Sequence, residues 1–430
     1  QSEQFLSNAR SPLRHALSPS CKVEAHERQH ASGVWLIGLS YPIICTTTET
    51  ISKRTTTKAN TLLMLASYIA AIVFSLIETA SALPYFADKN LEQSVRIELE
   101  QLQGDLRAED CAHMLFLTAE RADIKRLEGV EQLLDLRLLQ LSYNEIIDIQ
   151  PLESLIALRE LHLSNNPLQS IAPLRQLNEL MYLNLSNTGV RDLAPISALP
   201  VLIELSLSGN PQLDLQPLVH MHQLRKFSLG KSDIRDISPL ATLRAIERLS
   251  LANNRISELE PLRELTQLAS LNLWQNEIDD LTPLAALSRL QHLNLSANRI
   301  TDVNALSQLN QLRTLRLTDN SIKHVEPLAG LVDLTELRLG LNRIEDVLPL
   351  GKLAQVTVLD LNENSIRDIS SLGTLPRLEV LRLADNNLME LGALLALPAL
   401  RIVEVWGNPL SATGLQHVEM LRERGIEVQK

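Results

Sequence analysis

Two consecutive stretches, IERLSLANNRISELEPLRELTQ at residues 246–267 and LASLNLWQNEIDDLTPLAALSR at residues 268–289, share one pattern of 22 residues. In both, leucine or isoleucine stands at positions 1, 4, 6, 11, 14, 17 and 20, asparagine at position 9 and proline at position 16. The second stretch follows the first without a gap. This spacing decides the fold.

The pattern covers most of the chain. Units that open on Leu, Ile, Val or Met begin at residues 114, 136, 158, 180, 202, 224, 246, 268, 290, 312, 334, 356 and 378, and a truncated unit begins at Leu400. A fixed period of about 20–29 residues with an L-x-x-L-x-L-x-x-N core denotes leucine-rich repeats. One unit cannot bury its leucines alone, but stacked units bury them as a column. The sequence therefore predicts an α/β solenoid: a leucine-rich repeat horseshoe with a parallel concave sheet, a helical N-terminal cap and a C-terminal cap.

Asparagine recurs where the chain leaves each expected strand. Its amide offers both a donor and an acceptor to neighbouring turns, so we expect a structural asparagine ladder. Thr188 and Ser232 interrupt it and keep a hydroxyl that can do part of the same work. The expected ladder consists of Asn144, Asn166, Asn210, Asn254, Asn276, Asn298, Asn320, Asn342, Asn364, Asn386 and Asn408.

Proline and aspartate recur in the return segments. A locked φ suits the first turn of a short helix, and a carboxylate three residues earlier can cap that turn. An acidic row could also bind calcium, but capping is the simpler interpretation. The prolines are Pro151, Pro173, Pro195, Pro217, Pro239, Pro261, Pro283, Pro327 and Pro349, and the aspartates are Asp148, Asp192, Asp214, Asp236, Asp280, Asp302, Asp346 and Asp368.

The repeats are expected to occupy residues 114–407, as thirteen full units and a partial one. Residues 83–113 predict a helical N-terminal cap, with an amphipathic helix over 88–102 and a shorter one over 107–113. Residues 408–430 predict a C-terminal cap, with a helix over 415–424 and a final strand. Such caps cover the end leucines of a solenoid.

Residues 53–82 have the organisation of a secretory signal peptide. Lys53, Arg54 and Lys58 precede an apolar stretch over 61–77, and Ala80-Ser81-Ala82 follows it, which predicts cleavage after Ala82. The alternative is a membrane anchor, because the stretch has nearly the length that spans a bilayer. We expect residues 1–52, which contain neither a repeat nor a Met, to be a non-native extension or a disordered leader.

Removal of residues 1–82 would leave Cys111 as the only cysteine, so no disulfide is expected. Those residues hold 7 of the 40 Lys and Arg and 5 of the 51 Asp and Glu. The remaining chain would have 33 basic and 46 acidic residues, and therefore a net charge of −13. An acidic protein of this kind is a poor partner for nucleic acid. We therefore expect that the chain has no nucleic-acid partner and that it does not insert stably into a membrane after cleavage.

The run Phe86-Ala87-Asp88-Lys89-Asn90-Leu91-Glu92, the segment from Ile124 to Glu131, the 22-residue units and the ending Asn408-Pro409-Leu410-Ser411 together resemble bacterial internalin-like leucine-rich repeat proteins. The resemblance spans residues 84–430. It implies an exported protein whose concave face binds another protein. The chain lacks the Leu-Pro-x-Thr-Gly sorting signal and the immunoglobulin-like domain of the surface-attached members. The repeat also resembles that of the repeat-built, intracellular regulatory subunit of protein phosphatase 1.

Motifs of common enzymes are absent. The sequence has no phosphate-binding glycine loop, His-Glu-x-x-His, Gly-x-Ser-x-Gly or two-cysteine metal motif. His220 and His222 lie in a return segment with no third ligand nearby in sequence. We therefore expect no catalysis, no cofactor and no metal site.

The candidate binding residues lie between the inward leucines. Trp, Tyr and Arg are common at binding hot spots, although an outward Trp274 could equally pack on its strand neighbours. Arg316, Arg338 and Arg382 could also neutralise Glu336, Asp360 and Glu363 on adjacent strands. The concave candidates are Tyr143, His162, Tyr182, Trp274, His292, Arg316, Arg338, Asp360, Arg382 and Trp406.

The sequence thus predicts a non-enzymatic, secreted or periplasmic protein that presents a rigid concave face to a protein or peptide, as a monomer. Two alternatives remain open. One is an intracellular regulatory scaffold like the phosphatase subunit, and the other is a binder of envelope glycans.

Overall fold

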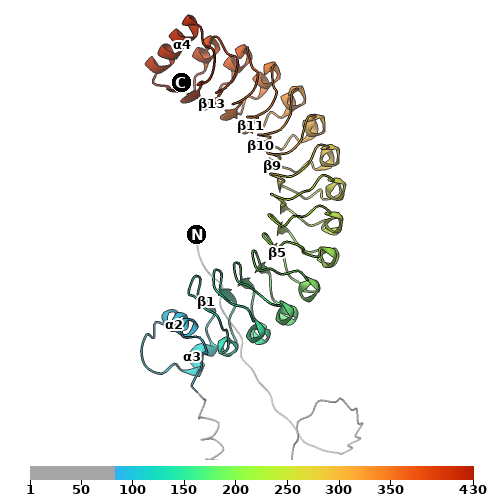
Figure 1. Ribbon diagram of the computed structural model, residues 1–430, viewed down its shortest axis with the longest axis vertical. Helices are drawn as coiled ribbons and strands as arrows, with labels where there is room; N and C mark the ends of the chain where they lie inside the picture. The colour runs from blue at the N-terminus through green and yellow to red at the C-terminus, as the bar shows by residue number, and fades with distance from the viewer. Residues whose placement is uncertain (1–82) are drawn as a thin grey trace, which may run out of the picture. The chain divides into compact units, whose positions relative to one another are not determined.

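Each repeat contributes one strand of three residues, and the strands lie side by side in chain order (Figure 1). The structure is a computed structural model that describes residues 83–430. The leader expected over 1–52 and the signal peptide expected over 53–82 lie outside the described residues. The strands are β1 (Phe116–Thr118), β2 (Leu138–Gln140), β3 (Glu160–His162), β4 (Tyr182–Asn184), β5 (Glu204–Ser206), β6 (Lys226–Ser228), β7 (Arg248–Ser250), β8 (Ser270–Asn272), β9 (His292–Asn294), β10 (Thr314–Arg316), β11 (Glu336–Arg338), β12 (Val358–Asp360), β13 (Val380–Arg382), β14 (Ile402–Glu404) and β15 (Glu427–Gln429).

Every neighbouring pair of strands is parallel, and from β1 to β14 the register advances by one repeat at each step. Leu139 of β2 pairs with Leu161 of β3, which lies 22 residues later. Side chains at the same position of successive repeats therefore form rows across the sheet. The sheet lines the inner side of the curved stack formed by residues 83–430, and the return segments line its outer side (Figure 1). The predicted leucine-rich repeat solenoid is confirmed.

The core is a column of leucines between the sheet and the return segments. The middle residue of each strand and the residue two places later point into it, as Leu293 and Leu295 do with exposed fractions of 1% and 0%. Full burial of one such side chain is worth about 2 kcal/mol. Because one face of every repeat is covered only by the next repeat, the column depends on stacking.

The return segments form 3-10 helices, which complete a turn with fewer residues than an α-helix. Nine of them have a recurring proline as their second residue. All eight recurring aspartates accept a hydrogen bond from the backbone N–H two residues later, as a capping carboxylate does. The 3-10 helices are η1 (Val130–Gln132), η2 (Gln150–Ser154), η3 (Ala172–Gln176), η4 (Ala194–Ile196), η5 (Gln216–His220), η6 (Ser238–Thr242), η7 (Glu260–Leu262), η8 (Thr282–Ala286), η9 (Asn304–Gln308), η10 (Glu326–Gly330), η11 (Leu348–Lys352), η12 (Ser370–Thr374) and η13 (Gly392–Ala396).

The eleven repeat asparagines join successive turns through their side chains. Each Nδ2 donates to the carbonyl three residues before it and to the carbonyl 25 residues before it. The Thr188 hydroxyl keeps the first of these bonds, at 2.7 Å to the Leu185 carbonyl. The Ser232 hydroxyl donates instead to the Gly230 carbonyl at 3.0 Å. The two substitutes thus supply fewer bonds than asparagine.

The N-terminal cap contains α2 (Lys89–Glu98) and α3 (Ala108–Ala112). Asp88 Oδ1 caps α2 by accepting from the Asn90 and Leu91 N–H groups, and its Oδ2 accepts from the N–H groups of Lys125 and Arg126 in the first repeat. One carboxylate therefore both begins the helix and attaches it to the stack. Helix α2 ends at Glu98, four residues before the predicted end, because the chain turns at Glu100 with a φ of 53°.

The C-terminal cap contains α4 (Ala412–Glu423) and the last strand, β15. Helix α4 begins three residues earlier than predicted, because the Ser411 side chain caps it by accepting from the Gly414 N–H. Val418 and Leu421 cover the last repeat. The Arg424 guanidinium donates to the carbonyls of Leu395 and Leu397 and so holds the end of the helix against η13.

Candidate binding surface

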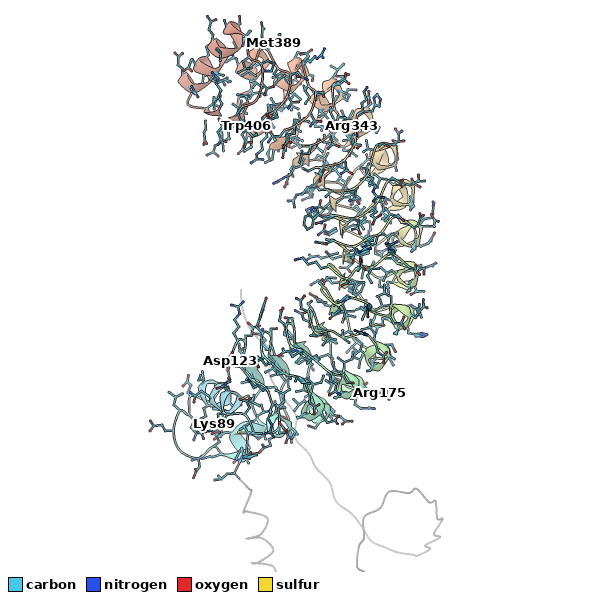
Figure 2. The ribbon with its side chains drawn as sticks, in the orientation of Figure 1. Lys89, Asp123, Arg175, Arg343, Met389 and Trp406 are labelled. Atoms are coloured by element: carbon cyan, nitrogen blue, oxygen red, sulfur yellow. The ribbon has the colours of Figure 1, made fainter. Side chains whose placement is uncertain are left out.

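The inner side of the sheet carries the side chains that the core leaves free. We define the concave face as the first and third residues of strands β2–β14, together with the two residues that begin two places beyond each strand. Figure 2 shows these side chains along the inner side, with Trp406 near one end, whereas Arg175 lies on the outer side. Alternation along a strand places the first and third residues on the same face, opposite the buried middle residue.

The structure distributes the ten predicted residues over four rows. His162, Arg316, Arg338, Asp360 and Arg382 are third residues of their strands, and Tyr182 and His292 are first residues. The remaining three lie beyond the strand ends and are exposed: Trp274 and Trp406 two places beyond, and Tyr143 three places beyond.

These residues do not form one cluster. Tyr143 follows β2 and Trp406 follows β14, at opposite ends of the sheet. The Tyr143 ring lies under the Arg121 guanidinium, 4.5 Å from its carbon, and thus has a partner within the chain. Three of the predicted residues do meet: Trp274, Arg316 and Arg338 line a hollow of about 580 Å³ whose lining also includes Ser296 and Ala297. Trp274 is 40% exposed, so most of its indole is covered by its own repeats.

The arginines beside this hollow share one carboxylate. Glu336 accepts from Arg316 Nε at 3.0 Å and from Arg338 Nε at 2.7 Å. Burial disfavours the Glu336 carboxylate, but the hydrogen bonds and charges of the two arginines outweigh burial and lower its pKa below the ordinary value. Two cations therefore share the Glu336 carboxylate, while Asp319 also lines the hollow and Asp360 lies near Arg338.

The charge ladder that the sequence offered as an alternative is present in part. Arg382 pairs with Glu404, at 2.8 Å, instead of the Asp360 or Glu363 of the sequence expectation. Asp360 makes no ion pair within 4 Å of its oxygens among the described residues, and burial raises the pKa of its carboxyl despite the nearby Arg382 and Arg338. On these strands only the Arg382–Glu404 pair is neutralised, so the C-terminal part of the face keeps an excess of negative charge.

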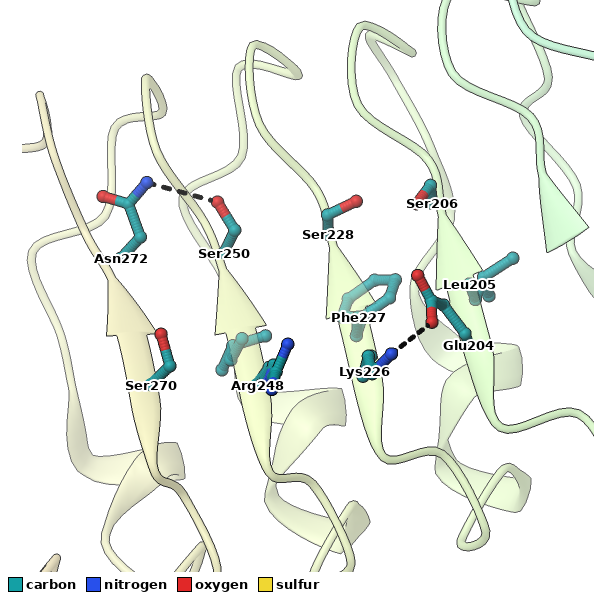
Figure 3. Close-up of a pocket in the computed structure, with 11 residues that line it drawn as sticks. Glu204, Leu205, Ser206, Lys226, Phe227, Ser228, Arg248, Ser250, Ser270 and Asn272 are labelled. Carbon is teal, nitrogen blue, oxygen red and sulfur yellow. Dashed lines mark hydrogen bonds and ion pairs between the residues drawn. The ribbon is translucent and has the colours of Figure 1, made fainter. Parts of the chain in front are cut away.

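A second group of concave residues was missed by the sequence analysis. Lys226 and Arg248 are first residues of β6 and β7, in a hollow of about 200 Å³ whose wall includes Ser228, Ser250 and Ser270 (Figure 3). The available signal was alternation itself, because the first strand residue lies on the same face as the third. From this row the sequence analysis selected only Tyr182 and His292, and it left out Lys226 and Arg248.

The two basic residues of this hollow differ in their partners. Lys226 Nζ pairs with Glu204 at 2.9 Å, a contact drawn in Figure 3. Arg248 is exposed and makes no ion pair with any residue in the described part of the chain. The small serines beside it allow a partner to approach the sheet closely.

Other kinds of site were sought within residues 83–430. No group of three or more His, Cys, Asp or Glu in that range could hold a metal ion. None of the helices there has the length and apolar character that a membrane crossing requires. Cys111 is buried, and burial is the first cause of the raised pKa of its thiol.

Comparison with family models matches parts of the repeat region. The model described as "Leucine rich repeat" matches residues 266–322, and the model described as "Leucine Rich repeats (2 copies)" matches residues 135–176, 244–286 and 354–393. No curated protein sequence matches the chain.

Solved structures are similar over most of the chain. An internalin, inlF, of Listeria monocytogenes is 27% identical, with 82% of this chain and 99% of that chain covered and a TM-score of 0.66. A leucine-rich repeat protein of Leptospira interrogans is 25% identical, over 72% and 82% of the two chains, with a TM-score of 0.67. The ectodomain of the plant receptor kinase GASSHO1/SCHENGEN3 of Arabidopsis thaliana, in complex with Casparian strip integrity factor 2, is 23% identical over 71% and 40%, with a TM-score of 0.61.

The repeats, the parallel inner sheet and the helical caps define a leucine-rich repeat protein, a class whose members generally serve as protein-interaction modules. Within this class, the chain is similar to the Listeria internalin and to the Leptospira repeat protein. The chain is an internalin-like leucine-rich repeat protein.

Proposed function

We propose that this chain is an exported, non-enzymatic module that binds a protein or peptide on its concave face. The observation that carries the proposal is the row of solvent-facing side chains on a sheet whose opposite side is fully packed. A surface held by a packed core loses little conformational entropy when it binds. The plant receptor ectodomain in complex with Casparian strip integrity factor 2 is an example of this fold holding a ligand.

The middle of the face offers the best anchors. Trp274 stands exposed at the edge of the hollow that Arg316 and Arg338 also line. Trp and Arg are over-represented among residues that dominate binding energy. We propose Trp274, Arg316, Arg338 and His292 as the central contacts, and the remaining predicted concave residues as peripheral ones.

Site-specific photo-crosslinking in the native cell tests the use of the face. A benzophenone side chain at His292 should capture a partner, whereas the same group at Ser288, exposed in the return segment of the preceding repeat, should not. The captured protein is then purified and titrated against the full chain. Trp274→Ala and Arg316→Ala should weaken its binding and leave the melting temperature nearly unchanged. The assignment is contradicted if the two variants lose folding to the same extent as binding, or if the partner is captured only at Ser288.

Export is the second part of the proposal, and the basic, apolar and small-residue order of 53–82 supports it. Fractionation of the native cell and mass mapping of the mature chain test it. We expect a start at Leu83, in the periplasm or the medium. Retention of residues before 83 in the cytosol would favour the intracellular scaffold instead.

A further inference from the structure

The charges of the concave face are not evenly distributed along the stack. The first and third residues of β6–β11 include four cations, Lys226, Arg248, Arg316 and Arg338, and one anion, Glu336. We call these positions the central basic stretch. The turn residues just beyond these strands add one charge of each sign, Lys231 and Asp319, which cancel.

The two ends of the concave face are acidic. At the first and third positions, strands β2–β5 carry Glu160 and Glu204 and no Lys or Arg. Strands β12–β14 carry Asp360 and Glu404 against Arg382, and the turns beyond them add Glu363 and Asp385. The whole chain has a formal net charge of −11. The positive charge of the central basic stretch is therefore a local feature, opposite in sign to the net charge of the chain.

The cations of the central basic stretch keep unused hydrogen-bonding capacity. Arg316 and Arg338 donate to Glu336 through three N–H groups in total, and the rest of their donors have no partner among the described residues. Their side chains are 42% and 41% exposed. Arg248 has no ion-pair partner within residues 83–430. A guanidinium with free N–H groups suits carboxylates especially well.

We propose that the central basic stretch binds an acidic segment of the partner protein, with one apolar side chain of that segment against Trp274. This deepens the proposed function and rests on it. Six strands about 4.8 Å apart span roughly 24 Å, the length of about seven extended residues. The acidic ends of the face repel an acidic segment that runs further, which sets both its length and its position.

Labelled heptapeptides test the proposal with the full chain by fluorescence anisotropy. The probe Glu-Asp-Glu-Phe-Glu-Asp-Glu should bind at least about tenfold more tightly than its amide counterpart Gln-Asn-Gln-Phe-Gln-Asn-Gln at low ionic strength. The difference should shrink between about 20 and 200 mM salt, because counterions screen exposed charges. Equal binding of the two peptides overturns the proposal.

Two sets of variants locate the site. Arg248→Gln breaks no ion pair of the described chain and should weaken binding of the acidic probe several-fold. The double variant Arg316→Gln/Arg338→Gln should weaken that binding about tenfold. Arg299→Gln is the matched control, because Arg299 loses the same charge in a neighbouring repeat, from an exposed pair with Glu277. Equal effects of the control and the concave variants overturn the proposal, provided that all variants melt like the parent chain.

A heptauridylate RNA probe tests whether the stretch binds nucleic acid in preference to an acidic peptide. Tighter binding of the RNA than of the acidic peptide, lost in the same arginine variants, overturns the peptide assignment. The two proposals fail separately. If crosslinking at His292 yields a partner whose affinity is unchanged by substitution of Arg248, Arg316 and Arg338, the binding module stands and only the acidic partner segment is wrong.

Discussion

The Asn276 side chain satisfies three backbone groups, and its loss should destabilise the stack. Its Nδ2 donates to the carbonyls of Leu251 and Leu273, and its Oδ1 accepts from the Ile256 N–H. We expect Asn276→Ala to cost about 2–4 kcal/mol, since each buried group left unpaired costs roughly 1–3 kcal/mol. Urea unfolding followed by circular dichroism measures the change.

A graded substitution distinguishes hydrogen bonding from packing at this position. Asn276→Thr should fall between the parent chain and the alanine variant, because the hydroxyl of Thr188 keeps one of the ladder bonds in the natural chain. Gln275→Ala, at the exposed neighbouring residue, should leave the urea midpoint almost unchanged. A midpoint for Asn276→Ala close to that of Gln275→Ala would show that the ladder bond contributes little.

The carboxylate of Asp88 should make the N-terminal cap sensitive to acid. Burial opposes its charge, but four backbone N–H groups outweigh burial and lower its pKa. The stabilisation is present above the unfolded-state pKa of about 3.9 and is lost as the pH falls through the lower folded-state pKa. Asp88→Ala should therefore cost about 1–2 kcal/mol near pH 6, as loss of a helix cap does, and much less near pH 2. Hydrogen exchange of α2 at the two pH values measures this, and an equal cost at both contradicts it.

At the scale of elements, Gly414 determines how closely α4 lies on the last repeat. A Cβ at this position would stand 2.2 Å from the Met389 carbonyl oxygen, a backbone atom that cannot move aside cheaply. Gly414→Ala should displace α4 and loosen β15, although alanine favours helix in itself. Hydrogen exchange at β14 and β15 should quicken. Thr413→Ala, at the exposed preceding residue of the same helix turn, is the control and should leave the exchange unchanged.

Most elements could be predicted from the sequence because the repeat specifies them many times over. The strand positions, the proline-led return segments and the capping aspartates each recur at one place in the unit, so chance matches average out. The predicted end of α2 and the predicted start of α4 were less accurate. They depend on single features outside the repeat, a left-handed turn at Glu100 and the cap at Ser411.

The concave face was predictable only in part. Periodicity identifies which positions lie on the concave face, and it placed Trp274, Arg316 and Arg338 there. The sharing of Glu336 by two arginines depends on side-chain conformations that spacing does not specify. Arg248 is an exposed first residue of its strand, and it is noticed only when both outward positions of every strand are considered together.

At the scale of the whole molecule, stability should be local because each repeat contacts mainly its neighbours. Leu293→Ala in the middle of the stack removes a side chain that is 1% exposed and should cost about 2–5 kcal/mol. Its effect should concentrate near β9, so that hydrogen exchange quickens most in the adjacent repeats and least at the two caps. His292→Ala, one residue earlier and exposed, should change little. Unfolding that stays equally sharp, with exchange raised uniformly from α2 to β15, would instead mean that the stack unfolds as one cooperative unit.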